Sequence, residues 1–146
     1  MFAAGLLRYL TTREVLTYGQ SGADGFLQAL PDKPVEAVGA FSRPGGAETD
    51  GGHGYDEPGA QFIVRGDHKA GAGRRAGYAR ARRIRDELHG LAAVTLAEGT
   101  DDELWLVQCL ATTSEPVDLG GDPDGRPRWS IEVRAETFRP TLLRGE

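Results

Sequence analysis

The spacing of apolar residues predicts two amphipathic helices. Phe2, Leu6, Tyr9 and Leu10 recur at helical intervals, which predicts a short helix over residues 2–13. A longer helix is predicted over residues 74–89, and Gly90 is suited to end it. The apolar side chains of the longer helix fall on one face: Tyr78, Ala81, Ile84, Leu88 and Leu91.

Apolar runs at residues 26–30, 35–42, 61–65 and 104–111 predict strands, and residues 31–34 (PDKP) form a turn that makes the first two antiparallel. Residues 104–111 carry apolar residues on both faces, which predicts a central position in the sheet. Residues 122–125 (DPDG) have the composition of a type I turn. After this turn, apolar and polar residues alternate from Trp129 to Glu136, so the last strand has one buried face.

Together these elements predict an α+β fold, with a mostly antiparallel sheet of about five strands and two helices packed on one face. The length of 146 residues fits a single domain spanning residues 1–146. Residues 43–59 contain six glycines and two prolines without any periodicity, which predicts a long flexible loop.

Composition narrows the possible functions. The net charge of −5 argues against a general nucleic-acid-binding protein, although local patches can differ from the total. The single cysteine, Cys109, lies in an apolar run and is expected to be a packed thiol of the core in a reducing compartment. No apolar run reaches the ~20 residues needed to span a bilayer, and the N-terminus lacks a basic segment for export.

Candidate catalytic and metal-binding patterns are weak. His53, His68 and His89 are scattered, and the combination of Asp50, His53 and Asp56 matches no ligand signature, so no metal site is expected. Three glycines precede or begin the longer helix, but their spacing is wrong for a phosphate-binding loop, so a flexible start of the helix is predicted: Gly71, Gly73 and Gly77. No serine has the surroundings of a nucleophile and no carboxylate pair lies in an apolar setting. Neither an enzyme nor a cofactor is expected.

Six arginines are concentrated in the longer helix: Arg74, Arg75, Arg80, Arg82, Arg83 and Arg85. One interpretation is a solvated helix face on which Asp86, Glu87 and nearby acids pair with some of the arginines. The other is a surface for phosphate or for an acidic protein partner, because arginine pairs well with both. The residues alone leave both interpretations open.

Four pieces of the chain, taken in order, resemble the phage minor capsid and tail terminator family, the head–tail completion proteins of long-tailed phages. They are residues 30–38 (LPDKPVEAV), 61–66 (QFIVRG), 84–90 (IRDELHG) and 119–130 (LGGDPDGRPRWS). The resemblance extends over residues 26–138, and the last piece is the most specific.

The resemblance implies a structural virion protein without catalysis. Such proteins form a ring, commonly hexameric, that caps the tail tube and joins it to the head–tail connector or stopper protein, while DNA passes through without sequence-specific binding. The implied location is the tail–head junction of the virion, with assembly in the host cytoplasm. No membrane partner is implied. The alternatives are another head–tail joining adaptor, namely a head completion protein, or a small nucleic-acid-binding domain that uses the arginine-rich helix.

Within this interpretation we assign hypothetical contact residues. Those for the oligomer or partner interface are Arg74, Arg75, Arg82, Arg83, Asp122, Arg126 and Trp129. Arg126 is also expected to hydrogen-bond a neighbouring backbone, and the turn at Asp122 to hold the register of the last hairpin. The loop residues expected to contact the tail tube or connector are Gly45, Asp50, His53 and Tyr55.

Overall fold

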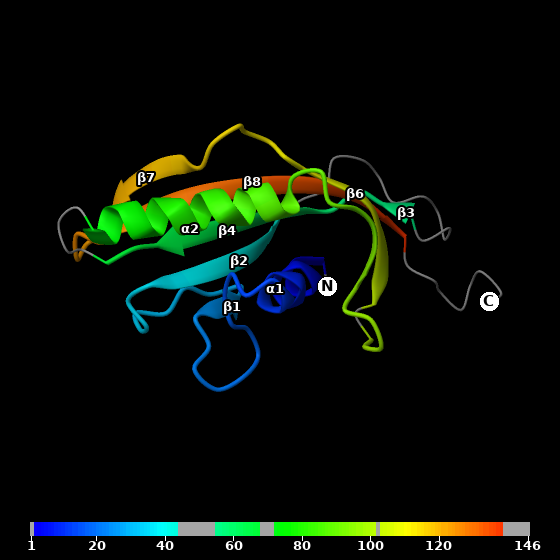
Figure 1. Cartoon of the computed structure of the whole chain (residues 1–146), viewed down its shortest axis with the longest axis horizontal. Helices are drawn as coiled ribbons and strands as arrows, with labels where there is room; N and C mark the ends of the chain where they lie inside the picture. Colours follow the sequence, from blue (N-terminus) through cyan, green and yellow to red (C-terminus); the bar gives the residue numbers. More distant parts are fainter. Residues whose placement is uncertain (1, 44–54, 68–71, 102, 139–146) are drawn as a thin grey trace.

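The computed structural model describes residues 2–43, 55–67, 72–101 and 103–138 (Figure 1). The two helices are α1 (Phe2–Thr12) and α2 (Ala72–Leu88). The strands are β1 (Gly25–Leu27), β2 (Ala37–Arg43), β3 (Tyr55–Asp56), β4 (Gly59–Arg65), β5 (Ala92–Leu96), β6 (Leu104–Ala111), β7 (Val117–Gly121) and β8 (Pro127–Phe138). Neither helix of this described part is long and apolar enough to cross a membrane.

The strands form one mixed sheet of eight strands in the order β1-β2-β4-β8-β6-β5, and β3 and β7 also pair with β8. The long strand β8 organises this sheet, because it pairs antiparallel with β4 and β3 on one side and with β7 and β6 on the other. The α+β class is as predicted, but the expected five strands were too few. The sequence interpretation missed β5, and it missed the short β3 and β7 because segments of two and five residues have too little periodicity.

The first two strands were expected to be antiparallel, and this prediction was wrong. Gly25 is paired with Val38 and Leu27 with Ala40, so β1 and β2 run parallel. Residues 28–36 therefore do not form a hairpin turn. They cross the end of the sheet and return the chain to the level at which β1 began.

Both helices pack on one face of the sheet, as predicted. The side chains of Leu6, Leu7 and Leu10 from α1 and of Ile84 and Leu88 from α2 are fully buried in a single core. The same core takes the alternate residues of the central strands: Val38, Ala40, Phe62, Val64, Ile131 and Val133. Each of the larger side chains, valine and above, contributes roughly 1.5–3 kcal/mol by its burial.

Neither helix of the described part of the chain lies on the opposite face of the sheet (Figure 1). Strand β6 lies between β8 and β5, but only its inner residues, such as Leu106 and Cys109, are buried. Trp105 and Leu110, on the outer face, are each 43% exposed. Strand β6 is thus an interior strand, as its apolar residues predicted, but no helix of the described chain covers its outer face, because both helices lie on the same side.

Gly73 and Gly77 serve close packing in α2, which begins at Ala72, two residues before its predicted start, and the flexible entry to this helix stays a prediction. Gly73 and Gly77 lie within α2 and are buried. A Cβ atom at Gly77 would lie 2.5 Å from Cζ3 of Trp129, and one at Gly73 would lie 2.5 Å from the carbonyl oxygen of Asp67. A side chain at Gly77 would hold the helix away from the sheet, and one at Gly73 would collide with the connection that precedes the helix. Gly71 lies outside the described residues.

The predicted loop over residues 43–59 was too long at both ends. Arg43 closes β2, Tyr55 and Asp56 form β3, and Gly59 opens β4. Residues 44–54 lie outside the described part of the chain. Tyr55 is paired with Phe138, so it belongs to the sheet rather than to a loop.

Candidate functional site

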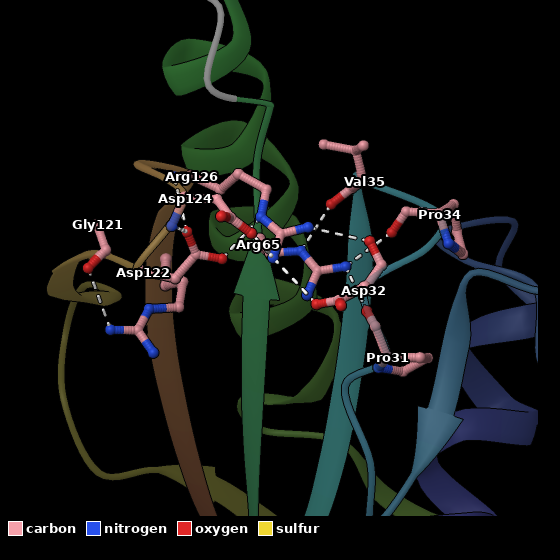
Figure 2. A network of polar contacts seen from close by, with 10 residues as sticks. Pro31, Asp32, Pro34, Val35, Arg65, Gly121, Asp122, Asp124 and Arg126 are labelled. Carbon is pink, nitrogen blue, oxygen red and sulfur yellow. Dashed lines mark hydrogen bonds and ion pairs between the residues drawn. The ribbon is translucent and has the colours of Figure 1, made fainter.

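Three of the four sequence pieces meet at one end of the sheet (Figure 2). The connection from β1 to β2, the end of β4 and the turn before β8 lie side by side there, although they are separated in sequence by up to 94 residues. Two arginines, Arg65 and Arg126, join the three segments.

Arg65 ends β4 and is only 3% exposed. Its Nε donates to the carbonyl of Val35 at 2.8 Å, and its Nη2 donates to the carbonyls of Pro31 at 2.5 Å and Pro34 at 2.8 Å. Burial lowers the pKa of Arg65, and the positive charge of Arg126 lowers it further. The guanidinium thus satisfies three carbonyls of a connection that forms no regular structure.

Arg126 and Asp122 form the second half of the network. The Oδ2 of Asp122 accepts from Nε of Arg126 at 2.7 Å, and its Oδ1 accepts from the backbone N–H groups of Asp124 and Arg126 at 2.9 Å each. Arg126 also donates to the backbone carbonyl of Asp32 at 3.0 Å, which confirms the expected bond to a neighbouring backbone. Burial opposes ionisation of Asp122, but the hydrogen bonds from Arg126 and Asp124 outweigh it and hold the pKa of this carboxyl below its ordinary value.

The predicted turn is present. The N–H of Gly125 donates to the carbonyl of Asp122 at 2.8 Å, and Gly125 has a φ of 79°, which glycine adopts without strain. The carboxylate of Asp122 fixes the turn. The turn places Arg126, directly before β8, within hydrogen-bonding distance of Asp32. This network is suited to holding loops together, since both buried guanidinium groups are already engaged by carbonyls and carboxylates.

The rest of the described chain shows no arrangement suited to catalysis. Among these residues no three His, Cys, Asp or Glu side chains gather as they would around a metal ion. Nδ1 of His89 accepts from the N–H of Ala111 at 3.0 Å, and the hydroxyl of Ser130 accepts from the amide of Gln61 at 2.9 Å. Asp50, His53 and His68 lie outside the described residues.

Most arginines of α2 have partners within the chain. Arg80 pairs with Asp24 at 2.5 Å and Arg74 with Asp118 at 3.4 Å. Arg82 lies near Asp86 and Glu115, Arg85 pairs with Asp86, and Arg83 donates to the carbonyl of Arg13. These contacts favour the interpretation of a partly paired helix face over that of a nucleic-acid-binding surface, although the outward arginines remain exposed.

The other hypothetical contact residues differ in their surroundings. Trp129 is 4% exposed beneath α2, with the guanidinium of Arg74 5.8 Å from its ring centre. Tyr55 donates from its hydroxyl to Glu136 at 2.7 Å, and this hydrogen bond, together with burial, raises the pKa of Tyr55 to about 12. Gly45, Asp50 and His53 lie outside the described residues, so the role of the loop stays a prediction, as do the interface roles of the remaining residues.

Two features were not identified from the sequence. Arg65 was included in a predicted strand without any role, although an arginine that closes an apolar strand can indicate a buried cation that needs acceptors. The second feature is the exposure of three apolar residues on the outer face of the sheet: Trp105, Leu110 and Phe138. They are 43%, 43% and 39% exposed; Trp105 and Phe138 are paired and form an apolar patch on the outer face of the sheet, and Leu110 lies farther along β6.

The fold defines a small α+β protein with a polar network that joins three segments at one end of its sheet. Comparison with known protein families defines the class of protein more closely. Residues 9–137 match the family described as bacteriophage tail terminator protein. The chain belongs to the bacteriophage tail terminator family, whose members are structural components of the virion tail and are not enzymes. No curated protein matches the sequence.

Proposed function

We propose that the chain forms a ring, most simply a hexamer, that caps the tail tube and joins it to the head–tail connector or stopper protein. DNA passes through this ring without sequence-specific contacts. The family match over residues 9–137 carries the proposal. The uncovered outer face of the sheet supports it, because exposed apolar side chains gathered on one face are typical of a surface that another protein covers.

The residues divide into two kinds in this proposal. Asp122, Arg126 and Arg65 hold the end of the sheet rigid, which is useful to a subunit that must fit neighbours on several sides. The outward arginines of α2 and the segment containing Gly45, Asp50, His53 and Tyr55 provide partner contacts. Assembly takes place in the host cytoplasm, and the finished ring remains at the tail–head junction.

Deleting the gene from the phage that encodes it tests this function. Electron micrographs of the lysate are expected to show filled heads and separate tails that lack a cap, and a plasmid copy of the wild-type gene restores joined particles. A second plasmid copy, lacking residues 45–53, is expected to fail in joining while its protein remains folded. Normal numbers of joined particles after deletion of the gene would refute the proposed function.

A further inference from the structure

The apolar patch on the outer face of the sheet crosses three neighbouring strands. Tyr55 of β3 is paired with Phe138 of β8, and Phe138 is paired with Trp105 of β6, so the three rings form a row about 10 Å long. The rings of Tyr55 and Phe138 meet edge to face at 5.4 Å. Leu110 lies farther along β6 on the same face.

Among the described residues, the connection between β5 and β6 places negative charge beside this patch. Thr95 of β5 is paired with Trp105, and β5 then runs into an exposed connection that contains Glu98 and Asp101. Neither carboxylate has an ion pair with a lysine or arginine of the described part of the chain. Residues 86–125 hold ten acidic residues and no lysine or arginine.

The solvent-facing side of α2 has the opposite character. Ala72, Ala76 and Ala79 are exposed and follow one another at helical spacing, which leaves a flat strip of small side chains. Exposed arginines flank this strip: Arg75, Arg82 and Arg83. Neither Arg75 nor Arg83 pairs with a carboxylate among the described residues, and residues 65–85 hold eight lysines and arginines against one aspartate.

A single subunit cannot bring these two surfaces together. Helix α2 covers the inner face of its own sheet (Figure 1), while the aromatic row is on the outer face. The β5–β6 connection and the N-terminal part of α2 also lie toward opposite ends of the molecule (Figure 1). Two different surfaces that complement each other in charge and shape produce a head-to-tail contact, and such contacts close into rings when the rotation allows it.

We propose that the outer face of α2 in one copy of this chain docks on the row of Tyr55, Phe138 and Trp105 in the next copy. The alanine strip allows the helix to approach the rings, and Arg75 and Arg83 face Glu98 and Asp101 of the neighbour. The aromatic row forms the apolar centre of the contact and the charges form its rim. A stable contact buries about 800 Å² on each partner, so the contact must include the charged residues around the aromatic row as well as the row itself. The inference rests on the proposed ring and names the surfaces that build it.

Charge reversal tests the pairing directly. Sedimentation velocity and native mass spectrometry at low ionic strength measure the assembly of the purified full-length chain. The variant Arg75→Glu/Arg83→Glu and the variant Glu98→Lys/Asp101→Lys are each expected to lose the ring. An equimolar mixture of the two restores rings, and only rings with an even number of subunits, because only unlike neighbours then attract. A single chain that carries all four changes also restores the ring. Matched controls with a reversed charge elsewhere on the surface, Lys33→Glu and Glu36→Lys, keep it.

The apolar centre has its own pair of variants. Trp105→Glu is expected to weaken self-association by at least about tenfold, as loss of a central tryptophan does. Leu119→Glu changes a side chain of similar exposure (39%) outside the proposed contact and keeps the ring. Circular dichroism establishes that each variant is folded. If the wild type forms rings and these variants do also, the docking surface is wrong while the ring function stands. If both charge variants are monomeric and their mixture stays monomeric, the pairing is wrong. A wild type that never forms a ring refutes both proposals.

Discussion

Replacement of Gly77 by alanine tests the packing of α2 on the sheet. Alanine in place of glycine within a helix normally stabilises it by about 1 kcal/mol, because glycine has more conformational freedom to lose on folding. At Gly77 we expect the opposite sign. The new Cβ would lie 2.5 Å from Cζ3 and 3.1 Å from Cη2 of Trp129, and 3.2 Å from the Cα of Gly66.

The magnitude follows from these distances. Carbon atoms pack comfortably at about 3.5–4.0 Å, so either the helix or the indole must move by roughly 1 Å. Trp129 is 4% exposed and also contacts Tyr78 edge to face at 6.3 Å, so it has little room to shift. Overpacking of this kind costs about 1–3 kcal/mol. After subtraction of the helix gain, Gly77→Ala should destabilise the fold by about 1 kcal/mol, which lowers the melting temperature by roughly 2–4 °C.

Two further variants separate packing from helix propensity. Ala79→Gly lies on the exposed side of α2 and should cost about 1 kcal/mol from propensity alone. Trp129→Phe removes the ring atoms that the new Cβ would meet, so Gly77→Ala should become neutral or stabilising in that background. The wild type, Gly77→Ala, Trp129→Phe and the double variant form a double-mutant cycle. Chemical denaturation of these four proteins measures the coupling energy between the two positions. A wild-type background in which Gly77→Ala is stabilising, or a cycle with no coupling, would contradict the packing argument.

Three other predictions concern the buried polar groups and the thiol. Arg65→Lys keeps the charge, but a lysine cannot reach the carbonyls of Pro31, Pro34 and Val35 together. Chemical denaturation should therefore show a free energy of unfolding lower by about 2–4 kcal/mol. The control Arg75→Lys, at an exposed position, should change this free energy little. Because the pKa of Asp122 is lowered in the folded state, its contribution to stability is complete above the unfolded pKa of about 4 and declines as the pH falls below that value. Denaturation between pH 7 and pH 3 should therefore show a shallower acid loss for Asp122→Asn than for the wild type, and equal slopes would exclude this role. Burial raises the pKa of Cys109 to about 12, so a disulfide reagent should modify the protein at pH 8 only after unfolding, and rapid modification of the native chain would show that the thiol is accessible.

Local patterns in the sequence determined much of the secondary structure. The helical spacing of Phe2, Leu6 and Leu10 gave α1, and the alternation that starts at Trp129 gave the buried face of β8, because periodicity records which side of an element is apolar. Residues 122–125 specified their own turn, since its hydrogen bonds lie within five residues. The family resemblance was also available from sequence, because its pieces are short and continuous.

Tertiary structure decided which segments meet and which surfaces stay open. The direction of β2 relative to β1 depends on a connection held by Arg65, whose acceptors are at least 30 residues away, and Arg126 reaches Asp32 across 94 residues. No local pattern contains such partners. Trp105 and Leu110 have the same apolar signature as buried strand residues, and only the placement of both helices on the other face leaves them exposed. The sequence by itself determined the secondary-structure elements and the family. The three-dimensional arrangement determined the polar network of Arg65 and Arg126 and the exposed outer face of the sheet, because both depend on contacts between distant segments.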